Sequence, residues 1–268
     1  MTTPVGVGQF IPWDGGCLII GHHHTAIPVH SHQAMQLVFG RDRDIRVRAG
    51  EQAPWLTYSM AGIPSRQPHS IDVTDSDYGA VIFIEPETAA GRVITERFLE
   101  DGIAEIGNEA LRGIAHDIFA AWLGERRDEL ISQLRLLVQS LSAGAPPAVV
   151  TDVRILNAIA YINAHLDRAV TLEEVAAHVC LSPSRFRHLF SEQTSVGLRP
   201  YVLWRRFLLV WDLMMKGSTL SAAAHAAGFA DAAHLSRTSN RMFGFAPSAM
   251  HVAASLPDPS KLPQRTTA

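Results

Sequence analysis

The stretch TLEEVAAHVCLSPSRFRHLFSEQTSVGLRP, residues 171–200, decides the fold of the carboxy-terminal region, because a second stretch repeats its pattern. The second stretch is STLSAAAHAAGFADAAHLSRTSNRMFGFAP, residues 218–247. Thr171 aligns with Thr219 about 48 residues later, and a glycine closes each stretch. A repeat of this kind indicates two copies of one small supersecondary unit.

Each copy has the sequence features of a helix-turn-helix unit. Thr171 can cap a first helix, with Glu174 three residues later as in a capping box. Ser182 and Pro183 then mark the start of a second helix, and Asp231 can cap the corresponding helix of the second copy. The sequence therefore predicts two pairs of crossed helices separated by short turns.

The second helix of each pair leaves polar side chains facing outward. In a helix that lies in the major groove of DNA, such positions face base edges and phosphates. The candidate DNA-binding residues are Ser184, Arg185, Arg187, His188, His234, Ser236, Arg237 and Asn240. Outward arginines on a helix are also typical of an ordinary solvated surface, but two units in register favour DNA binding. Phosphate contacts are expected to outnumber base contacts.

Residues 149–251 resemble the DNA-binding domain of the AraC/XylS family of transcription regulators. The segments that carry the resemblance are TLEEVA, LSPSRFRHLF, RPYVLWRRF, AGF at 227–229 and RMFGFAPS at 241–248. It implies two helix-turn-helix units joined by one long helix, with recognition helices in successive major grooves roughly 34 Å apart. Cys180 stands where the family usually has glycine. Promoter DNA and RNA polymerase are the expected macromolecular partners.

The amino-terminal region, residues 1–145, is expected to form a β-rich sensory and dimerisation domain. Short apolar runs such as CLIIG, MQLVFG and AVIFIEP recur between turn residues, which is typical of a small barrel or sandwich. Residues 88–141 change to helical spacing. The segment SAGAPPAVVT, residues 142–151, is interpreted as a linker because its two prolines cannot continue a helix. The proline-containing tail, residues 252–268, is expected to be disordered.

Histidines gather in the amino-terminal region. The spacing of His30, His32 and Gln36, and the later His69, resembles the two motifs of cupin proteins. The resemblance implies that these four side chains converge inside a barrel, where imidazoles and one oxygen ligand suit Zn, Ni, Fe or Mn. The alternative is a histidine-lined pocket that holds a small organic effector and no metal. The histidine run at 22–24 is interpreted as a surface turn, because consecutive strand residues point to opposite faces.

The predicted fold class is α+β with two domains. An amino-terminal cupin-like β-barrel with trailing helices precedes an all-α domain with two helix-turn-helix units. The leucines of the last trailing helix have the spacing of a helix-pair seam, which predicts a homodimer. Packing of the same stripe on its own barrel is the alternative. The stripe consists of Leu130, Leu134, Leu137 and Leu141.

Composition limits the class of protein. Hydrophobic residues make up 47% and charged residues 18%, which indicates a globular chain with no apolar run long enough to span a membrane. Residues 1–150 contain 11 Lys and Arg against 18 Asp and Glu, a net charge of −7, whereas residues 151–251 contain 10 against 7, a net charge of +3. This asymmetry favours nucleic-acid binding by the second half. Two distant cysteines and the absence of a secretory signal fit a cytoplasmic protein.

These patterns predict a sequence-specific DNA-binding transcription regulator that responds to a small molecule or a metal ion. No nucleophile–base pair or phosphate-binding glycine loop indicates an enzyme. Two alternatives stay open. The first is a cupin metalloenzyme fused to a DNA-binding domain, and the second is an architectural DNA binder without a ligand.

Overall fold

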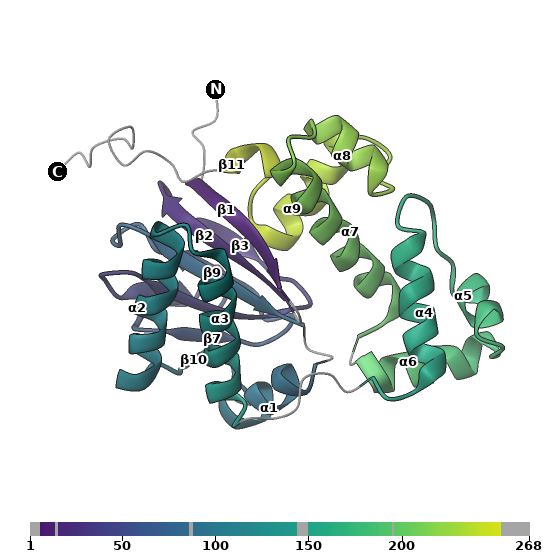
Figure 1. Cartoon of the computed structure of the whole chain (residues 1–268), viewed down its shortest axis with the longest axis horizontal. Helices are drawn as coiled ribbons and strands as arrows, with labels where there is room; N and C mark the ends of the chain where they lie inside the picture. Colours follow the sequence, from purple (N-terminus) through teal and green to yellow (C-terminus); the bar gives the residue numbers. More distant parts are fainter. Residues whose placement is uncertain (1–5, 14–15, 86–87, 144–149, 195, 253–268) are drawn as a thin grey trace.

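The amino-terminal half of the chain folds into two β-sheets (Figure 1). The computed structural model describes residues 6–13, 16–85, 88–143, 150–194 and 196–252. Within these ranges the larger sheet contains, in spatial order, β10 (Ala104–Glu105), β7 (Ala61–Ile63), β4 (Met35–Gly40), β9 (Gly79–Ile84), β2 (Gly16–His23), β1 (Gly6–Trp13) and β11 (Met250–Val252). The smaller sheet contains, again in spatial order, β3 (Ile27–His30), β8 (His69–Asp72), β5 (Ile45–Arg48) and β6 (Leu56–Tyr58). The strand pairs are antiparallel, apart from β1 and β11, which are parallel.

The larger sheet is buried on both faces, which is why its strands are continuous apolar runs. Side chains alternate between the two faces of a strand. On β9, Val81 and Phe83 belong to the core shared with the smaller sheet, whereas Ala80, Ile82 and Ile84 belong to the core under the helices. The central strand of the larger sheet therefore contributes to two hydrophobic cores at once.

Three helices follow the strands: α1 (Ala89–Phe98), α2 (Glu109–Leu123) and α3 (Arg127–Leu141). Helices α2 and α3 lie side by side and cover the outer face of the larger sheet (Figure 1). The leucine stripe of α3 is at most 2% exposed and packs into this core. The prediction that the stripe forms a seam between two copies was therefore wrong, because packing within its own domain already buries it. A homodimer as such stays a prediction.

The two sheets do not close into a barrel. In the part of the chain that the structure describes, the strands separate into two sheets with no hydrogen-bonded pair between them. The expected closed cupin-like barrel is thus not confirmed, although the β-rich domain with trailing helices is. The run at 22–24 also differs from its prediction: His22 and His23 lie on β2, and His23 is buried.

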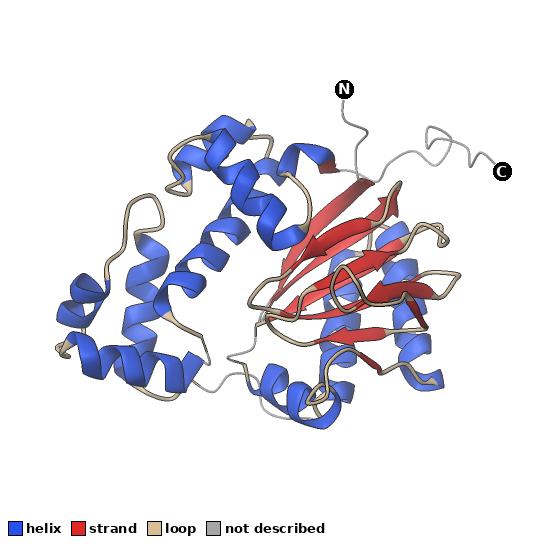
Figure 2. Cartoon of the chain, turned by 180° about the vertical axis from the view of Figure 1, so that it is seen from behind, coloured by secondary structure: helices blue, strands red, loops and turns tan. Residues whose placement is uncertain are grey.

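The second half of the described chain is almost entirely helical, as Figure 2 shows. Its helices are α4 (Val153–Ala164), α5 (Leu172–His178), α6 (Pro183–Thr194), α7 (Leu198–Met215), α8 (Leu220–Ala226), α9 (Ala232–Phe243) and the short 3-10 helix η1 (Pro247–Ala249). The two predicted helix pairs, α5–α6 and α8–α9, and the long joining helix α7 are therefore confirmed. Most of the predicted linker and the tail at 253–268 lie outside the described residues.

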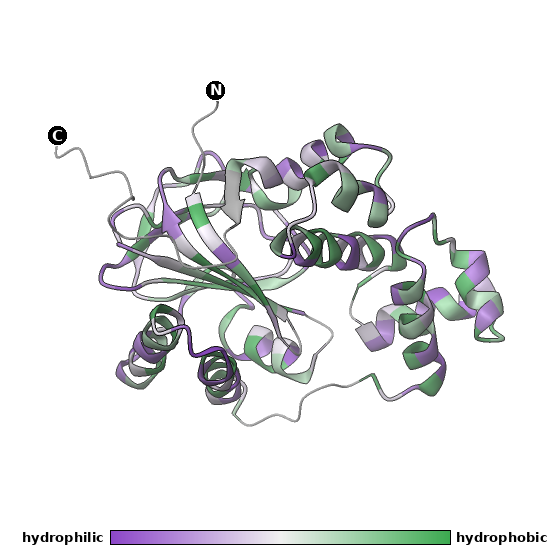
Figure 3. Cartoon of the chain, turned by 45° about the horizontal axis from the view of Figure 1, so that its top comes forward, coloured by the Kyte–Doolittle hydropathy of each residue, from purple (hydrophilic) through white to green (hydrophobic). Residues whose placement is uncertain are grey.

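The boundary between the hydrophobic cores does not coincide with the linker predicted at residues 142–151. Helix α4, the first helix pair and the beginning of α7 share one core, which includes Phe186 and Tyr201. The rest of α7 and the second pair join the core between the two sheets, through residues such as Trp211 and Phe243. In Figure 3 these helices alternate hydrophobic and hydrophilic residues, as expected for helices that cover a core on one side. The division therefore falls inside α7, and the second pair is packed onto the amino-terminal domain.

No helix in the described ranges combines the length and the apolar character that crossing a membrane requires.

Candidate nucleic-acid interface and histidine cluster

Helix α6 presents the outward face that the sequence predicts. The backbone N–H of Arg185 donates to Ser182 Oγ at 3.3 Å, which caps the beginning of the helix. Phe186, Leu189 and Phe190 are buried below it. The four candidate residues of this helix, Ser184, Arg185, Arg187 and His188, are all exposed. The burial pattern thus holds a basic, hydrogen-bonding surface toward solvent.

Helix α9 has the same arrangement. Asp231 caps it by accepting the backbone N–H of His234 at 2.6 Å. Leu235 is fully buried, and the hydroxyl of Ser239 donates to the backbone oxygen of Phe245 at 2.8 Å. The candidates His234, Arg237 and Asn240 are exposed, whereas Ser236 is half-buried. Ser236 is therefore the least accessible member of the predicted set.

The turn inside each pair is built in the same way twice. Leu181 N donates to Ala176 O, and Phe229 N donates to Ala224 O, both at 2.9 Å. The residue before each donor has a positive φ, +55° at Cys180 and +70° at Gly228. The sequence repeat is therefore also a geometric repeat, with cysteine in one copy at a conformation that favours glycine.

Thr171 caps α5, but the capping box is incomplete. Thr171 Oγ1 accepts the backbone N–H of Glu174 at 3.2 Å. The Glu174 carboxylate does not return to the cap and instead accepts hydrogen bonds from Arg168 and from the hydroxyl of Tyr161. These two donors lower the pKa of Glu174 to about 2. Glu174 therefore ties α5 to α4, a tertiary role that the sequence spacing did not predict.

His30, His32 and His69 meet at one place, and we call them the histidine cluster. His30 ends β3 and lies directly across from His69 at the beginning of β8. One ring nitrogen from each of the three lies within 4.8 Å of the corresponding nitrogens of the other two. Gln36 on β4 adjoins them, with 2.9 Å between its Oε1 and Nε2 of His32. The convergence expected from the sequence is present without a closed barrel.

Backbone carbonyls orient all three rings. Nδ1 of His30, His32 and His69 lies 2.9, 2.8 and 2.8 Å from the oxygens of Pro28, Ala34 and Gln67, respectively. A hydrogen on each Nδ1 satisfies these contacts and leaves each Nε2 as a lone-pair acceptor. Metal-binding histidines commonly have this arrangement, because the second nitrogen fixes the tautomer and the ring orientation.

Two Nε2 atoms of the cluster lack a satisfactory partner. His69 Nε2 is buried with no hydrogen-bond partner. Both ring nitrogens of His32 face oxygen acceptors, and only a protonated ring could donate to both. Burial lowers the pKa of His32 to about 4, so the ring is neutral at pH 7. A rotation of the Gln36 amide or a bound cation would resolve this conflict.

The other two rings are also neutral at pH 7. Burial and the neighbouring His32 lower the pKa of His30 to about 3. Burial, together with His30 and His32, holds the pKa of His69 well below its usual range. The cluster therefore offers uncharged imidazole nitrogens, which is the form that coordinates metal ions.

Little space remains beside the cluster. A cavity of about 10 Å³ is lined by His23, His30, Gln36 and apolar side chains from both halves of the chain, among them Phe243 and Phe245. A volume of this size accommodates roughly one water molecule or an ion, and no organic effector.

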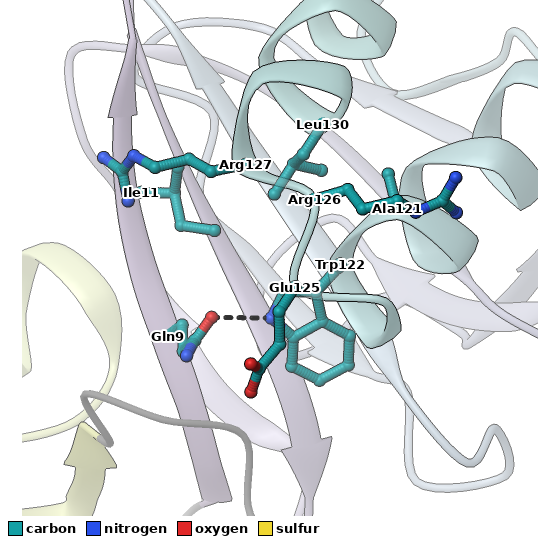
Figure 4. Close-up of a pocket in the computed structure, with 8 residues that line it drawn as sticks. All are labelled: Gln9, Ile11, Ala121, Trp122, Glu125, Arg126, Arg127 and Leu130. Carbon is teal, nitrogen blue, oxygen red and sulfur yellow. Dashed lines mark hydrogen bonds between the residues drawn. The ribbon is translucent and has the colours of Figure 1, made fainter.

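A larger cavity of about 250 Å³ lies on the helix-covered side of the sheet, between β1 and the turn from α2 to α3 (Figure 4). Trp122 lines it, and its Nε1 donates to Gln9 Oε1 at 2.8 Å. The exposed residues Glu125, Arg126 and Arg127 border the apolar lining. An apolar surface of this size with charged groups at its border suits a small organic molecule better than the 10 Å³ cavity at the histidine cluster does.

Comparison with known proteins identifies the helical region. Residues 175–251 match a family model described as a helix-turn-helix domain. The arabinose operon regulatory protein of Salmonella typhimurium is 31% identical over 144 residues, which cover 49% of this chain and 49% of that protein. Its namesake from Escherichia coli is 33% identical over 102 residues, 36% of this chain and 34% of that protein. The chain thus spans about half or less of the length of these relatives.

Solved structures resemble the chain over both halves. A substituted apo form of ToxT from Vibrio cholerae has a TM-score of 0.55 at 10% identity, covering 90% of this chain and 97% of that one. ToxT bound to (E)-4-(8-methylnaphthalen-1-yl)but-3-enoic acid has a TM-score of 0.53 at 12% identity, covering 86% and 95%. At this identity the likeness concerns the fold, which extends across the sheets and the helices alike.

Two helix-turn-helix units joined by α7 lie beside a two-sheet domain with trailing helices, and the ToxT structures share this fold. The chain resembles regulators of the AraC family, and residues 175–251 carry the match to the helix-turn-helix model.

Proposed function

We propose that this protein is a transcription regulator that binds promoter DNA through α6 and α9 and senses an effector in its amino-terminal domain. The observation that carries the proposal is the pair of helix-turn-helix units, each capped, packed on one face and exposed on the other. Arg185 and Arg187 on α6, and Arg237 on α9, supply the positive charge for phosphate or guanine contacts. RNA polymerase and a second copy of the chain are further proposed partners.

Selection of binding sites from random DNA duplexes tests the proposal. The wild-type chain should enrich one sequence in two parts, about one helical turn apart. The double variant Arg185→Ala/Arg187→Ala should bind the selected duplex at least about tenfold more weakly, with a shallower dependence on salt, because fewer counterions are released. The control is Arg112→Ala, which removes an exposed arginine from α2. Equal affinity of the double variant and the control would refute the assignment of α6.

The ligand that best suits the histidine cluster is a transition-metal ion. The fit rests on the unpartnered Nε2 of His69, on the acceptor conflict at His32 and on the backbone carbonyls that orient the rings. Three imidazoles and the Gln36 oxygen form a nitrogen-rich set, which favours Zn, Ni, Fe or Mn over Mg or Ca. Tetrahedral zinc places its nitrogen ligands about 3.4 Å apart, so the cluster would have to contract around the ion.

Metal analysis of the purified chain tests this part. The wild type should hold about one equivalent of Zn or Co after dialysis, and His30→Ala/His32→Ala should hold none. The double variant should keep its affinity for the selected duplex in the absence of effector, because its reading helices are unchanged. A wild-type chain that takes up no metal would overturn the metal assignment and leave DNA binding intact. The cavity between β1 and the α2–α3 turn would then be the better effector site, for a small organic molecule.

A further inference from the structure

We infer that the end of helix α9 closes the histidine cluster, so that metal binding and docking of the second helix-turn-helix unit on the sheets stabilise each other. This inference rests on the proposed metal site and names how that site is connected to DNA. It concerns the part of α9 that faces away from the candidate DNA-binding residues.

Phe243, the last residue of α9, lies over the cluster. Its ring stacks on His32 at an interplanar angle of 26°, with 6.3 Å between the ring centroids. The same ring contacts Phe83 on β9 at 5.8 Å and Phe207 on α7 at 5.1 Å. Phe243 is therefore part of the wall that separates the histidines from solvent.

Gly244 adds a closer contact with the cluster. A side chain at this position would place its Cβ 2.7 Å from Cγ2 of Ile27, 2.8 Å from the oxygen of Pro28 and 3.2 Å from Nδ1 of His30. The Pro28 oxygen is the acceptor that orients His30, 2.9 Å from its Nδ1. The backbone that follows α9 is thus packed directly against the group that fixes the first histidine.

The direction of the coupling follows from these contacts. When α9 is docked, Phe243 shields the cluster from bulk water, and His30 is held by a carbonyl that Gly244 packs against. When α9 moves away, the cluster is open to water and His30 loses that support. A metal ion should therefore bind the docked arrangement more tightly. Because linkage is reciprocal, the ion then favours docking by the same factor.

The histidine cluster and the candidate DNA-binding face of α9 are connected through the last turn of that helix. Asn240 on the exposed side of α9 is one helical turn from Gly244, and its backbone oxygen accepts the Gly244 N–H at 3.0 Å. The orientation of the outward residues on α9 thus depends on where the end of the helix is held. The first pair, α5–α6, has its own core and contacts the sheets far less. The metal ion should consequently act on the second DNA-binding helix and leave the first unchanged.

Two glycines provide a matched test in the full-length chain. Gly244→Ala adds a methyl group at φ +76°, where Ile27 and Pro28 crowd it, whereas Gly217→Ala adds one at φ +87° with no atom within 4 Å. Both changes carry similar backbone strain, and only the first affects docking. Cobalt(II) binding, followed by its visible absorption, should be at least about tenfold weaker in Gly244→Ala and within about twofold of wild type in Gly217→Ala. Phe243→Leu, which loses the stacking on His32 and keeps an apolar side chain, should also bind cobalt more weakly than the wild type. This variant serves as the test if Gly244→Ala fails to fold.

Hydrogen exchange gives a second readout. Adding cobalt to the wild type should slow amide exchange in α9 as well as in β3, and should leave α6 unchanged. Protection limited to the strands, or equal cobalt affinity in Gly244→Ala, Phe243→Leu and the wild type, would overturn the inference while the metal site stands. Absence of the cobalt absorption in the wild type would overturn both the metal site and its coupling to α9. Binding to the selected duplex would then still test the proposed regulator function independently.

Discussion

The two helix pairs have the same turn with a different residue at one position, so each residue can be replaced to test the cost of a side chain there. Cys180 and Gly228 occupy equivalent positions at φ +55° and +70°. A left-handed conformation costs a residue with a side chain roughly 1–2 kcal/mol, while glycine adds roughly 0.5–1 kcal/mol of chain entropy to the unfolded state. Cys180 is exposed. Cys180→Gly should therefore stabilise the chain by about 0.5–1 kcal/mol.

The opposite exchange should be much more costly. A Cβ at residue 228 would lie 2.4 Å from the oxygen of Leu166 and 2.7 Å from Nη2 of Arg206. That Nη2 atom donates to the oxygen of Arg168 at 2.6 Å, so it cannot move away freely. Backbone strain and overpacking together should make Gly228→Ala destabilising by about 3 kcal/mol.

Urea unfolding, followed by circular dichroism and tryptophan fluorescence, measures both effects. Cys180→Ala is the control, because it removes the thiol and keeps the strained backbone, and its unfolding free energy should stay near that of the wild type. If Cys180→Gly is no more stable than Cys180→Ala, the strain argument fails. If Gly228→Ala loses less than about 1 kcal/mol, the close approach of Leu166 and Arg206 is not present in solution.

Three shorter predictions follow from the cores and from His23. Burial lowers the pKa of His23 to about 4, so as the pH falls below about 6.5 this histidine is protonated in the unfolded chain before it is protonated in the folded one, and the folded state loses stability. His23→Leu should therefore reduce the loss of unfolding free energy between pH 6.5 and 4 by roughly 3 kcal/mol. A fragment of residues 150–252 should bind a hydrophobic dye and aggregate, whereas the full chain should not, because the fragment uncovers Trp211 and Phe243. Leu137→Ala should lower the unfolding free energy by about 2–5 kcal/mol and leave the sedimentation coefficient of the folded protein unchanged.

Local features were predictable from the sequence. The caps at Thr171, Ser182 and Asp231 and the inward position of Phe186 follow from short-range spacing, and all are confirmed. The convergence of the histidine cluster was also anticipated, because the resemblance to the cupin motifs implies it. That these exposed residues contact DNA and that these histidines bind metal stay predictions.

Features that depend on packing partners were not predictable. The stripe containing Leu134 has the same spacing whether it faces another chain or its own sheet, so spacing alone could not choose between them. One partner of Glu174, Tyr161, lies on α4, and the other, Arg168, lies between α4 and α5; hydrogen bonds of this kind leave no local sequence pattern. The cover that Phe243 places over the histidines requires docking of two regions about 200 residues apart in the sequence. No periodicity reports such docking.

The pairing of β11 with β1 affects the order in which the chain can complete its fold during synthesis. Gly6 on the first strand pairs with Met250, and the face between the sheets receives its cover from residues 204–245. A ribosome delivers these partners after the strands, so the edge of β1 and an apolar face stay open to solvent until residues 204–252 have been made. Contacts this distant in sequence slow folding and lengthen exposure to aggregation. We therefore expect the nascent protein to depend on chaperones until α7, α8 and α9 emerge.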